Sequence, residues 1–179
     1  MNPLKNWQVD RAAITMVGTD LRRPECILAE RDGTLWTADA RGGVMRIDPG
    51  GRQTLVAQSS DGHFDLQGDM KGSLLEGTLP NGLAFAANGD ILVSNFGTDR
   101  LEIMTREGKT RTLHDTIDGL PMGKVNFVLR DSKDRVWITV STRINPWSQA
   151  VCSTIADGYV ALLDDKGLRV VADGFAFTN

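Results

Sequence analysis

A frame of twelve residues occurs three times in this chain without a gap, at 25–36, 81–92 and 126–137. Each copy opens on an acid or an amide and closes on a large apolar side chain. The end residues are Glu25 and Trp36, Asn81 and Leu92, and Asn126 and Trp137. Self-similarity of this kind indicates a repeat architecture, in which each copy is one supersecondary unit that packs against its neighbours.

Three further apolar segments continue each unit after its frame, and turns that contain glycine separate them. The expected strands are 35–39, 44–48 and 52–57 in the first unit, 91–95, 101–104 and 110–114 in the second, and 136–140, 159–163 and 168–172 in the third. Asp32-Gly33 and Asn88-Gly89 lie between apolar segments and are strong hairpin signals, because glycine accepts positive φ.

Four short strands per unit, joined by glycine turns, are typical of a β-propeller blade. We therefore predict an all-β chain that forms three four-stranded blades. Their expected bounds are about 24–58, 80–115 and 125–173, and residues 174–179 would start a fourth blade.

The bulk composition excludes several classes of protein. With 41% hydrophobic and 24% charged residues, the chain has the composition of an ordinary globular protein. A net charge of −3 provides no field that would attract nucleic acid or an anionic membrane. No run of about 18 apolar residues predicts a transmembrane helix, and the N-terminus lacks the apolar segment of a signal peptide. We expect a cytoplasmic protein that binds neither nucleic acid nor membrane.

Three blades would leave two open faces, since propellers close with about 4–8 blades. We therefore expect a second polypeptide to complete the ring, either a C-terminal half or a second copy of this chain. The segment 13–17 resembles the last strand of a unit and would complete the final blade of a closed ring.

Several of these motifs, taken in order, resemble those of the senescence marker protein/gluconolactonase family, which includes regucalcin-like lactonases. The motifs are Pro24-Glu25, Asp32-Gly-Thr-Leu-Trp36, Asn126 nine residues before Arg135, and Asp173-Gly-Phe-Ala-Phe-Thr-Asn179. The resemblance covers about half of a family member, its N-terminal half. It implies a six-bladed propeller with one divalent metal ion at the end of the central channel and lactonase activity.

The resemblance also assigns roles to individual residues. It implies that Glu25 and Asn179 are metal ligands and that Asn126 contacts substrate. Lys124 stands where the family has an arginine for substrate, and lysine lacks the planar fork of arginine. Asn81 is an additional amide at the equivalent position of the second unit and a further substrate-binding candidate. The family's general-base aspartate would follow Asn179, so the catalytic residue of this chain is unknown.

The residue types themselves favour a site for a hard cation. The frame-opening residues start the innermost strands, so they would converge on the channel axis and present one carboxylate and several amide oxygens. Such a ligand set suits Ca²⁺ first, with Mg²⁺, Mn²⁺ or Zn²⁺ as alternatives. The expected function is a metal-dependent hydrolase that opens a lactone or related cyclic ester in the channel, complete only with a second polypeptide.

Two other functions stay open. The chain could be the N-terminal product of self-cleavage after Asn179, and the companion chain would then carry the N-terminal nucleophile of an amidohydrolase. It could also be a non-catalytic propeller that binds a metal or another ligand. An end at Asn179 also fits a split gene or a truncated half that pairs with itself.

Two insertions between strands are expected to shape a pocket. The first runs from Ser59 to Leu79 and includes His63, and the second runs from Thr142 to Asp157 and includes Trp147. Loops at this level of a propeller can cover the channel and determine specificity.

Overall fold

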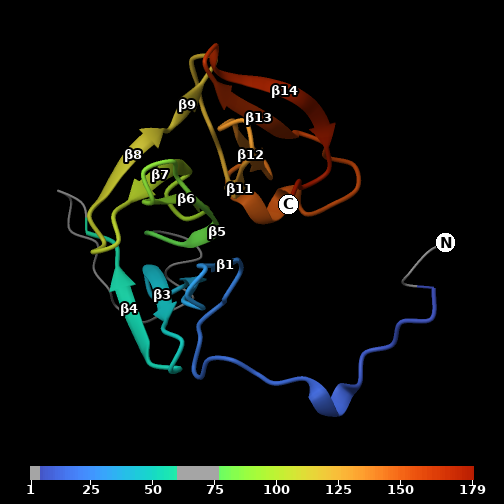
Figure 1. Ribbon diagram of the computed structural model, residues 1–179. Helices are drawn as coiled ribbons and strands as arrows, with labels where there is room; N and C mark the ends of the chain where they lie inside the picture. Colours follow the sequence, from blue (N-terminus) through green and yellow to red (C-terminus); the bar gives the residue numbers. More distant parts are fainter. Residues whose placement is uncertain (1–4, 60–76) are drawn as a thin grey trace.

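In the described part of the chain, the strands form three four-stranded antiparallel sheets and one two-stranded sheet (Figure 1). The computed structural model describes residues 5–59 and 77–179. Most of the first expected insertion, His63 included, therefore lies outside the described residues. Among the described residues, the only helical elements are two short 3₁₀ turns, η1 (Arg11–Ala13) and η2 (Trp147–Ala150). No helix in this part of the chain is long and apolar enough to cross a membrane.

Each four-stranded sheet is a meander in which sequential strands are hydrogen-bonded neighbours. The first sheet contains β1 (Ile27–Ala29), β2 (Leu35–Asp39), β3 (Gly43–Ile47) and β4 (Gln53–Ala57). The second contains β5 (Pro80–Phe85), β6 (Ile91–Asn95), β7 (Arg100–Met104) and β8 (Thr110–His114). The third contains β11 (Val125–Arg130), β12 (Val136–Val140), β13 (Gly158–Asp164) and β14 (Gly167–Phe175). The small sheet pairs β9 (Thr116–Ile117) with β10 (Leu120–Pro121).

The first hairpin of each sheet turns at the same position of the repeat. Gly33 and Gly89 have φ values of 92° and 88°, as the hairpin signals in the sequence predict. Asp134 is the equivalent residue of the third sheet and has a φ of 61°. Aspartate tolerates this left-handed region better than most residues, so the third hairpin keeps its geometry without glycine.

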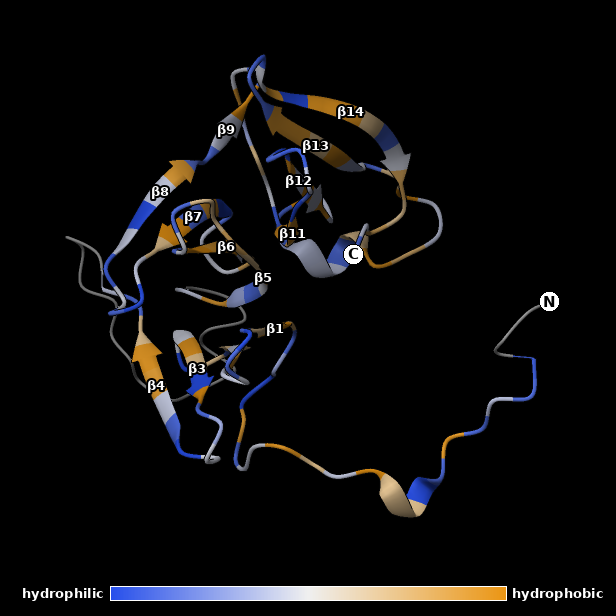
Figure 2. Ribbon diagram, in the orientation of Figure 1, coloured by the Kyte–Doolittle hydropathy of each residue, from blue (hydrophilic) through white to orange (hydrophobic). Residues whose placement is uncertain are grey.

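The sheets pack face to face through two apolar clusters. The first and second sheets share a cluster that includes Trp36, Val44, Leu83 and Val93. The second and third sheets share a larger one: Ala84, Leu92, Leu101, Ile117, Met122, Val125, Val128, Val136, Ile138, Val140, Tyr159 and Ala161. The inner strands β1, β5 and β11 consequently lie on the concave side of an arc, and β4, β8 and β14 lie on its outside (Figure 1). Figure 2 shows that hydrophobic residues concentrate in the strands and hydrophilic ones in the turns.

The inner strands of the second and third sheets have a bulge near their first residues. There a side-chain hydroxyl of the next strand accepts the backbone hydrogen bond that the ladder lacks. Gly82 N donates to Ser94 Oγ at 2.7 Å, and Phe127 N donates to Thr139 Oγ1 at 3.0 Å. The inner strands also approach closely, since a Cβ on Gly82 would lie 2.7 Å from the Cα of Phe127.

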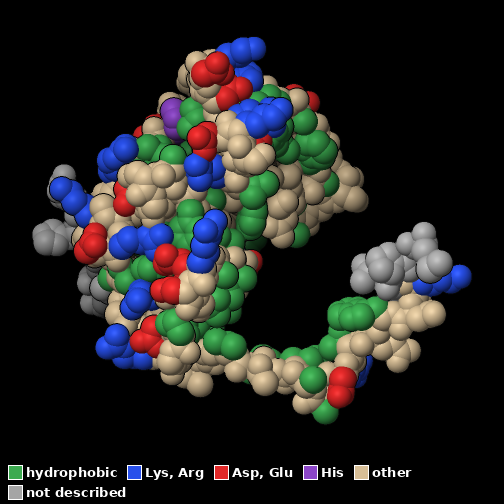
Figure 3. Space-filling view, in the orientation of Figure 1, with side chains coloured by type: hydrophobic (Ala, Val, Ile, Leu, Met, Phe, Trp, Pro, Cys, Tyr) green, Lys and Arg blue, Asp and Glu red, His purple; other side chains and the backbone are tan. Residues whose placement is uncertain are grey.

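Two segments differ from the sequence expectation. β14 extends to Phe175, which pairs with Gly158, so residues 174 and 175 belong to the third sheet rather than to the start of a fourth blade. Residues 13–17 form no strand. They belong to an arm that leads away from the sheets (Figures 1 and 3). Its Trp7 and Met16 side chains are 68% and 91% exposed.

Apolar side chains also remain exposed on the faces of the first and third sheets that point away from the second sheet. Ile27 is 64% exposed, and its neighbour Leu28 packs against the cluster on the opposite face. Leu129 is 54% exposed next to the fully buried Val128. Since successive strand residues point to opposite faces, Ile27 and Leu129 lie on the faces of their sheets opposite to Leu28 and Val128, where buried residues such as Met45 and Leu162 also lie.

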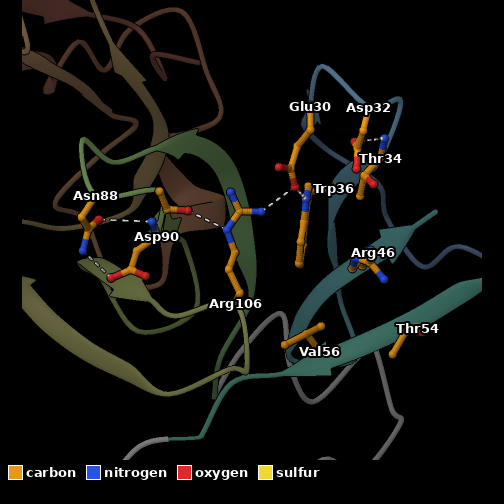
Figure 4. A pocket seen from close by; sticks show the side chains of 11 residues that line it. Glu30, Asp32, Thr34, Trp36, Arg46, Thr54, Val56, Asn88, Asp90 and Arg106 are labelled. Carbon is orange, nitrogen blue, oxygen red and sulfur yellow. Dashed lines mark hydrogen bonds and ion pairs between the residues drawn. The ribbon is translucent and has the colours of Figure 1, made fainter. Parts of the chain in front are cut away.

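Arg106 joins the first two sheets near the turns that follow β1 and β5 (Figure 4). Its Nη1 donates to Glu30 Oε1 at 2.7 Å, and its Nε donates to the carbonyl of Gly89. Its guanidinium also lies 4.8 Å from the Trp36 ring centroid and 4.7 Å from that of Phe85. One side chain thus combines an ion pair, a hydrogen bond and two cation–π contacts across the sheet boundary.

We expect Arg106→Ala to lower the free energy of unfolding by about 1–3 kcal/mol, because it removes these contacts and leaves Glu30 without its cation. Denaturant unfolding monitored by circular dichroism measures the change. Arg31→Ala removes an exposed arginine of the same region and should change stability by less than about 0.5 kcal/mol. Equal effects of the two substitutions would show that Arg106 does not join the sheets.

Candidate functional site

Two of the frame-opening residues contact each other directly at the start of the inner strands. Asn81 Nδ2 donates to the Asn126 carbonyl at 2.7 Å and to Asn126 Oδ1 at 3.0 Å. Asn126 Nδ2 in turn donates to Ser141 Oγ at 2.8 Å. Both asparagines are buried, with 3% and 7% exposure. The repeat therefore brings equivalent positions of neighbouring sheets into hydrogen-bond contact.

The oxygen of the Asn81 amide group lacks a hydrogen-bond donor from the described part of the chain. Its Oδ1 is buried and has no hydrogen-bond partner among the described residues. A buried acceptor without a donor is costly, so such atoms often contact a water molecule, an ion or a ligand. Because Nδ2 is directed at Asn126, Oδ1 is directed away from the third sheet.

Lys124 extends from the third sheet to the loop that follows β6 in the second. Its Nζ donates to the Phe96 carbonyl at 3.2 Å and forms an ion pair with Asp99 Oδ1 at 2.8 Å. It also lies 5.4 Å from the Phe96 ring centroid. The lysine side chain is only 11% exposed, so this charge is largely withdrawn from water and is compensated by one carboxylate.

Glu25 lies before β1, and its carboxylate pairs with Arg23 at 3.3 Å. The Arg23 guanidinium lies 6.0 Å from the Phe96 ring, the same ring that Lys124 approaches. One Arg23 nitrogen, Nη1, is buried and has no hydrogen-bond partner in the described part of the chain. Phe96 is thus the point where groups from the first and third sheets meet the second.

Asn179 is exposed and makes no side-chain hydrogen bond or ion pair with the described residues. Its neighbour Thr178 is tied to the asparagine pair, because the Thr178 carbonyl accepts a hydrogen bond from Ser141 Oγ at 2.7 Å. Of the five residues that the sequence indicates, Asn81, Asn126 and Lys124 lie at one buried junction. Glu25 is linked to this junction by its ion pair with Arg23, whose guanidinium lies near the Phe96 ring. Asn179 directly follows Thr178, whose carbonyl accepts a hydrogen bond from Ser141.

In the first two sheets, a polar residue at the end of the second strand positions the segment that leads into the first strand of the same sheet. In the first sheet, Asp39 Oδ2 accepts from Arg22 N at 3.3 Å, and Ala40 N donates to the Arg22 carbonyl at 2.8 Å. In the second sheet, Asn95 Oδ1 accepts from Leu79 N at 2.9 Å. This repeated Asp39/Asn95 position is visible in the sequence as a polar residue at the end of an apolar strand, and it was not among the predicted site residues.

Asn95 also belongs to a buried polar network beneath the Phe96 loop. Its Nδ2 donates to Glu102 Oε2 at 2.8 Å, and the same carboxylate oxygen accepts from Gln58 Nε2 at 2.7 Å. Thr98 Oγ1 donates to the other Glu102 oxygen at 3.0 Å. The backbone N–H groups of Gly97 and Thr98 both donate to Asn95 Oδ1 at 3.2 Å. These hydrogen bonds therefore fix the position of the loop that carries Phe96 and Asp99.

The residues at this junction fit a hard cation only in part. Glu25 supplies a carboxylate and Asn81 an amide oxygen without a donor, and both are ligand types that Ca²⁺ and Mg²⁺ accept. However, the described residues contain no group of three or more His, Cys, Asp or Glu side chains that could hold a metal ion. Further oxygen ligands would have to come from amides, backbone or water.

Three aromatic side chains lie beside this junction. Phe96 and Trp147 meet edge to face with ring centroids 5.5 Å apart, and Trp147 and Phe177 are 5.9 Å apart. Phe96 is buried, whereas Trp147 and Phe177 are half-buried. The expected second insertion thus places Trp147, in η2, at the same end as the asparagine pair. Sequence reasoning did not indicate Phe96, Phe177 or Asp99, because their roles depend on contacts between sheets.

Comparison with solved structures identifies the architecture. The chain superimposes on a gluconolactonase from Xanthomonas campestris with a TM-score of 0.56, at 17% identity over 79% of this chain and 44% of that one. It matches virginiamycin B lyase from Staphylococcus aureus with a TM-score of 0.53, at 17% identity over 82% of this chain and 40% of that one. The fold is a β-propeller.

A further match is a chain of a nidogen/laminin complex, with a TM-score of 0.57 and 18% identity over 85% of this chain and 49% of that one. This chain thus spans less than half of each of these three proteins. No protein-family model matches the sequence, and no curated protein matches it. At this level of identity the comparisons show the fold, and the activity has to be inferred from the site.

Stability should depend on pH through Asp39. Burial opposes ionisation of this carboxyl group, but hydrogen bonds from the Arg41 side chain, Arg41 N and Arg22 N outweigh burial and hold its pKa below the usual value. A carboxylate with a lowered pKa stabilises the fold above its unfolded-state pKa of about 3.9, and the contribution is lost as pH falls through the folded-state pKa.

We therefore expect Asp39→Asn to destabilise the protein at pH 7, by about 1–3 kcal/mol. The difference from the wild type should shrink as the pH is lowered below about 4. Urea unfolding of both proteins across this pH range measures it. A difference that stays constant with pH would mean that the charge of Asp39 contributes nothing to stability.

Proposed function

We propose that this chain contributes the first three blades of a propeller hydrolase that opens a lactone or a related cyclic ester. The observation that carries the proposal is the junction of Asn81, Asn126 and Lys124 at one end of the inner strands, with Glu25 beside it through Arg23. The gluconolactonase among the structural neighbours supports a lactonase-type propeller at this coarse level.

The residues of the junction suit an ester carbonyl. The Lys124 ammonium has three N–H groups, of which one donates to the Phe96 carbonyl, and Asp99 is its ion-pair partner. A remaining N–H can donate to the carbonyl oxygen and stabilise the negative charge that develops when water adds to the carbon. The ring C–O bond then breaks, and the alkoxide takes a proton to give a hydroxy acid. Asn81 Oδ1 can accept a hydrogen bond from the attacking water or a substrate hydroxyl. We assign no general base within the described residues.

We propose that a divalent cation, with Ca²⁺ as the first choice, binds at Glu25, Asn179 and the free oxygen of Asn81. When bound, it would polarise the ester carbonyl as a Lewis acid. We also propose that further sheets pack against the first and third blades where Ile27 and Leu129 are exposed. A C-terminal half or a second copy of the chain could supply these sheets.

Hydrolysis of a panel of lactones, followed by pH-stat titration of the acid released, tests the proposed reaction. We expect turnover of at least one cyclic ester, and we expect Lys124→Met to lower kcat/KM by about 10²-fold or more because it removes the donor to the carbonyl. Lys133→Met, at an exposed turn of the same blade, is the matched control and should leave kcat/KM unchanged. The proposal fails if purified protein together with its companion sheets hydrolyses none of the lactones.

The cation is tested by calorimetric titration with Ca²⁺. Glu25→Gln should abolish binding while the thermal unfolding of the ligand-free protein stays the same within a few degrees, because Glu25 is exposed and forms a single ion pair with the described residues. Glu107→Gln, another exposed glutamate, should bind Ca²⁺ like the wild type. Unchanged binding by Glu25→Gln would remove this residue from the site.

A non-catalytic binding propeller is the second candidate. The asparagine pair favours it, because the side-chain N–H groups of both residues donate to other protein groups. The match to a nidogen/laminin complex also favours it. Tight ligand binding without turnover of any cyclic ester would support it.

A further inference from the structure

A cleft between the first and second sheets lies at the opposite end of the inner strands from the asparagine pair (Figure 4). Strands β2, β3 and β4 and the turn before β2 form one wall, and the turns that follow β5 and β7 form the other. The cleft has a volume of about 680 Å³, which lies within the range of small-molecule sites. Both walls belong to this chain, so the cleft is formed without a companion polypeptide.

The centre of the cleft holds an ion pair. Arg106 Nη1 donates to Glu30 Oε1 at 2.7 Å, and Trp36 Nε1 donates to the same oxygen at 2.6 Å. The other terminal nitrogen of Arg106, Nη2, has no hydrogen-bond partner in the described part of the chain. Because Glu30 already balances the charge of Arg106, this nitrogen suits a neutral acceptor such as an amide carbonyl.

Two half-buried charges on either side of this ion pair lack a counter-ion among the described residues. Arg46, on β3, lies 5.9 Å from the Trp36 ring centroid, and its guanidinium forms no hydrogen bond or ion pair with those residues. Asp90, on the turn after β5, accepts a hydrogen bond from the Asn88 amide at 2.8 Å and forms no ion pair with them. Figure 4 shows Arg46 and Asp90 on opposite sides of Arg106. A charge that has lost part of its hydration is stabilised by an opposite charge, so each side of the cleft favours a ligand group of opposite sign.

The Arg46 side of the cleft also contains an unsatisfied hydroxyl (Figure 4). Thr34 is only 1% exposed, and its Oγ1, which lies near Asp32, forms no hydrogen bond of ordinary geometry with the described residues. The carboxylate of Asp32 accepts a hydrogen bond from Thr34 N at 2.9 Å. A buried hydroxyl without a partner is costly, and an acceptor on a ligand would satisfy it.

The charges of the lining disfavour simple ions. Among the described residues, two arginines face three carboxylates across the cleft, which gives a net charge of −1; they are Arg46, Arg106, Glu30, Asp32 and Asp90. A simple anion would be repelled by this surplus, and a simple cation would meet the unpaired guanidinium of Arg46. A ligand that carries both signs avoids both penalties.

We infer that this cleft binds a small zwitterion of about dipeptide length. Its carboxylate pairs with Arg46 and accepts a hydrogen bond from the Thr34 hydroxyl. Its ammonium pairs with Asp90, and the amide between the two ends accepts a hydrogen bond from Arg106 Nη2. The charged ends have to lie several bonds apart, because Arg106 separates Arg46 from Asp90 (Figure 4). This binding site is separate from the proposed reaction site and does not depend on lactone hydrolysis.

Calorimetric titration of the purified protein with alanyl-alanine tests the inference at low salt and about pH 7, where both ends of this dipeptide are charged. Alanyl-alanine should bind, whereas its N-acetylated form and its C-terminal amide should each bind at least about fivefold more weakly. Acetylation removes the charge that pairs with Asp90, and amidation removes the charge that pairs with Arg46. Both changes are made to the ligand, so they leave the fold of the protein untouched.

Two variants assign each end of the ligand to its residue. Arg46→Met should bind alanyl-alanine and its amide with similar affinity, and it should still discriminate against the acetylated form. Asp90→Asn should show the opposite pattern. Arg111→Met and Asp165→Asn, at exposed positions outside the cleft, are the matched controls and should behave like the wild type.

Three outcomes would overturn the inference. Alanyl-alanine fails to bind, either modification of the dipeptide leaves its affinity for the wild type unchanged, or Arg46→Met and Asp90→Asn keep the wild-type pattern of discrimination. Circular dichroism shows whether each variant is folded, and the two modified dipeptides decide the matter with the wild type alone if a variant is not.

Discussion

Face-to-face packing of the sheets is the interaction on which everything else in this structure depends. A single four-stranded meander cannot bury an apolar face by itself, and each sheet here covers its neighbour with branched and aromatic side chains. Because the sheets are twisted, this packing sets them in an arc with their first strands innermost (Figure 1). The polar junction follows from that arrangement, since residues far apart in the sequence meet only where the inner strands begin.

Much of the architecture could be predicted because repetition is a property of the sequence itself. The spacing of the frame gave the hairpins at Gly33 and Gly89, and the strand segments after each frame lie close to the observed bounds. The same spacing placed Asn81 and Asn126 at equivalent positions, and the structure brings them into direct contact. The extension of β14 to Phe175 could not be read in this way, because it depends on pairing with Gly158 across a bulge.

The chemistry of the junction was less accessible to sequence reasoning. Equivalent positions indicate which side chains converge, but not which hydrogen bonds they form with one another. The use of the Asn81 donors on Asn126, and the free acceptor that remains, depends on distances between two sheets. Asp99 shows the same limit: a surface aspartate in a glycine-containing loop has no distinguishing signal until Lys124 of another blade is placed beside it.

The hydroxyl groups at the bulges have an evolutionary consequence. Ser94 and Thr139 accept the backbone hydrogen bonds next to Asn81 and Asn126, so the sheet does not depend on which residue occupies those two positions. In the second and third sheets, a change of the frame-opening residue could therefore alter the chemistry of the site while the hydroxyl preserves the ladder. A new ligand could then be accommodated at Asn81 or Asn126 by substitution without redesign of the blade.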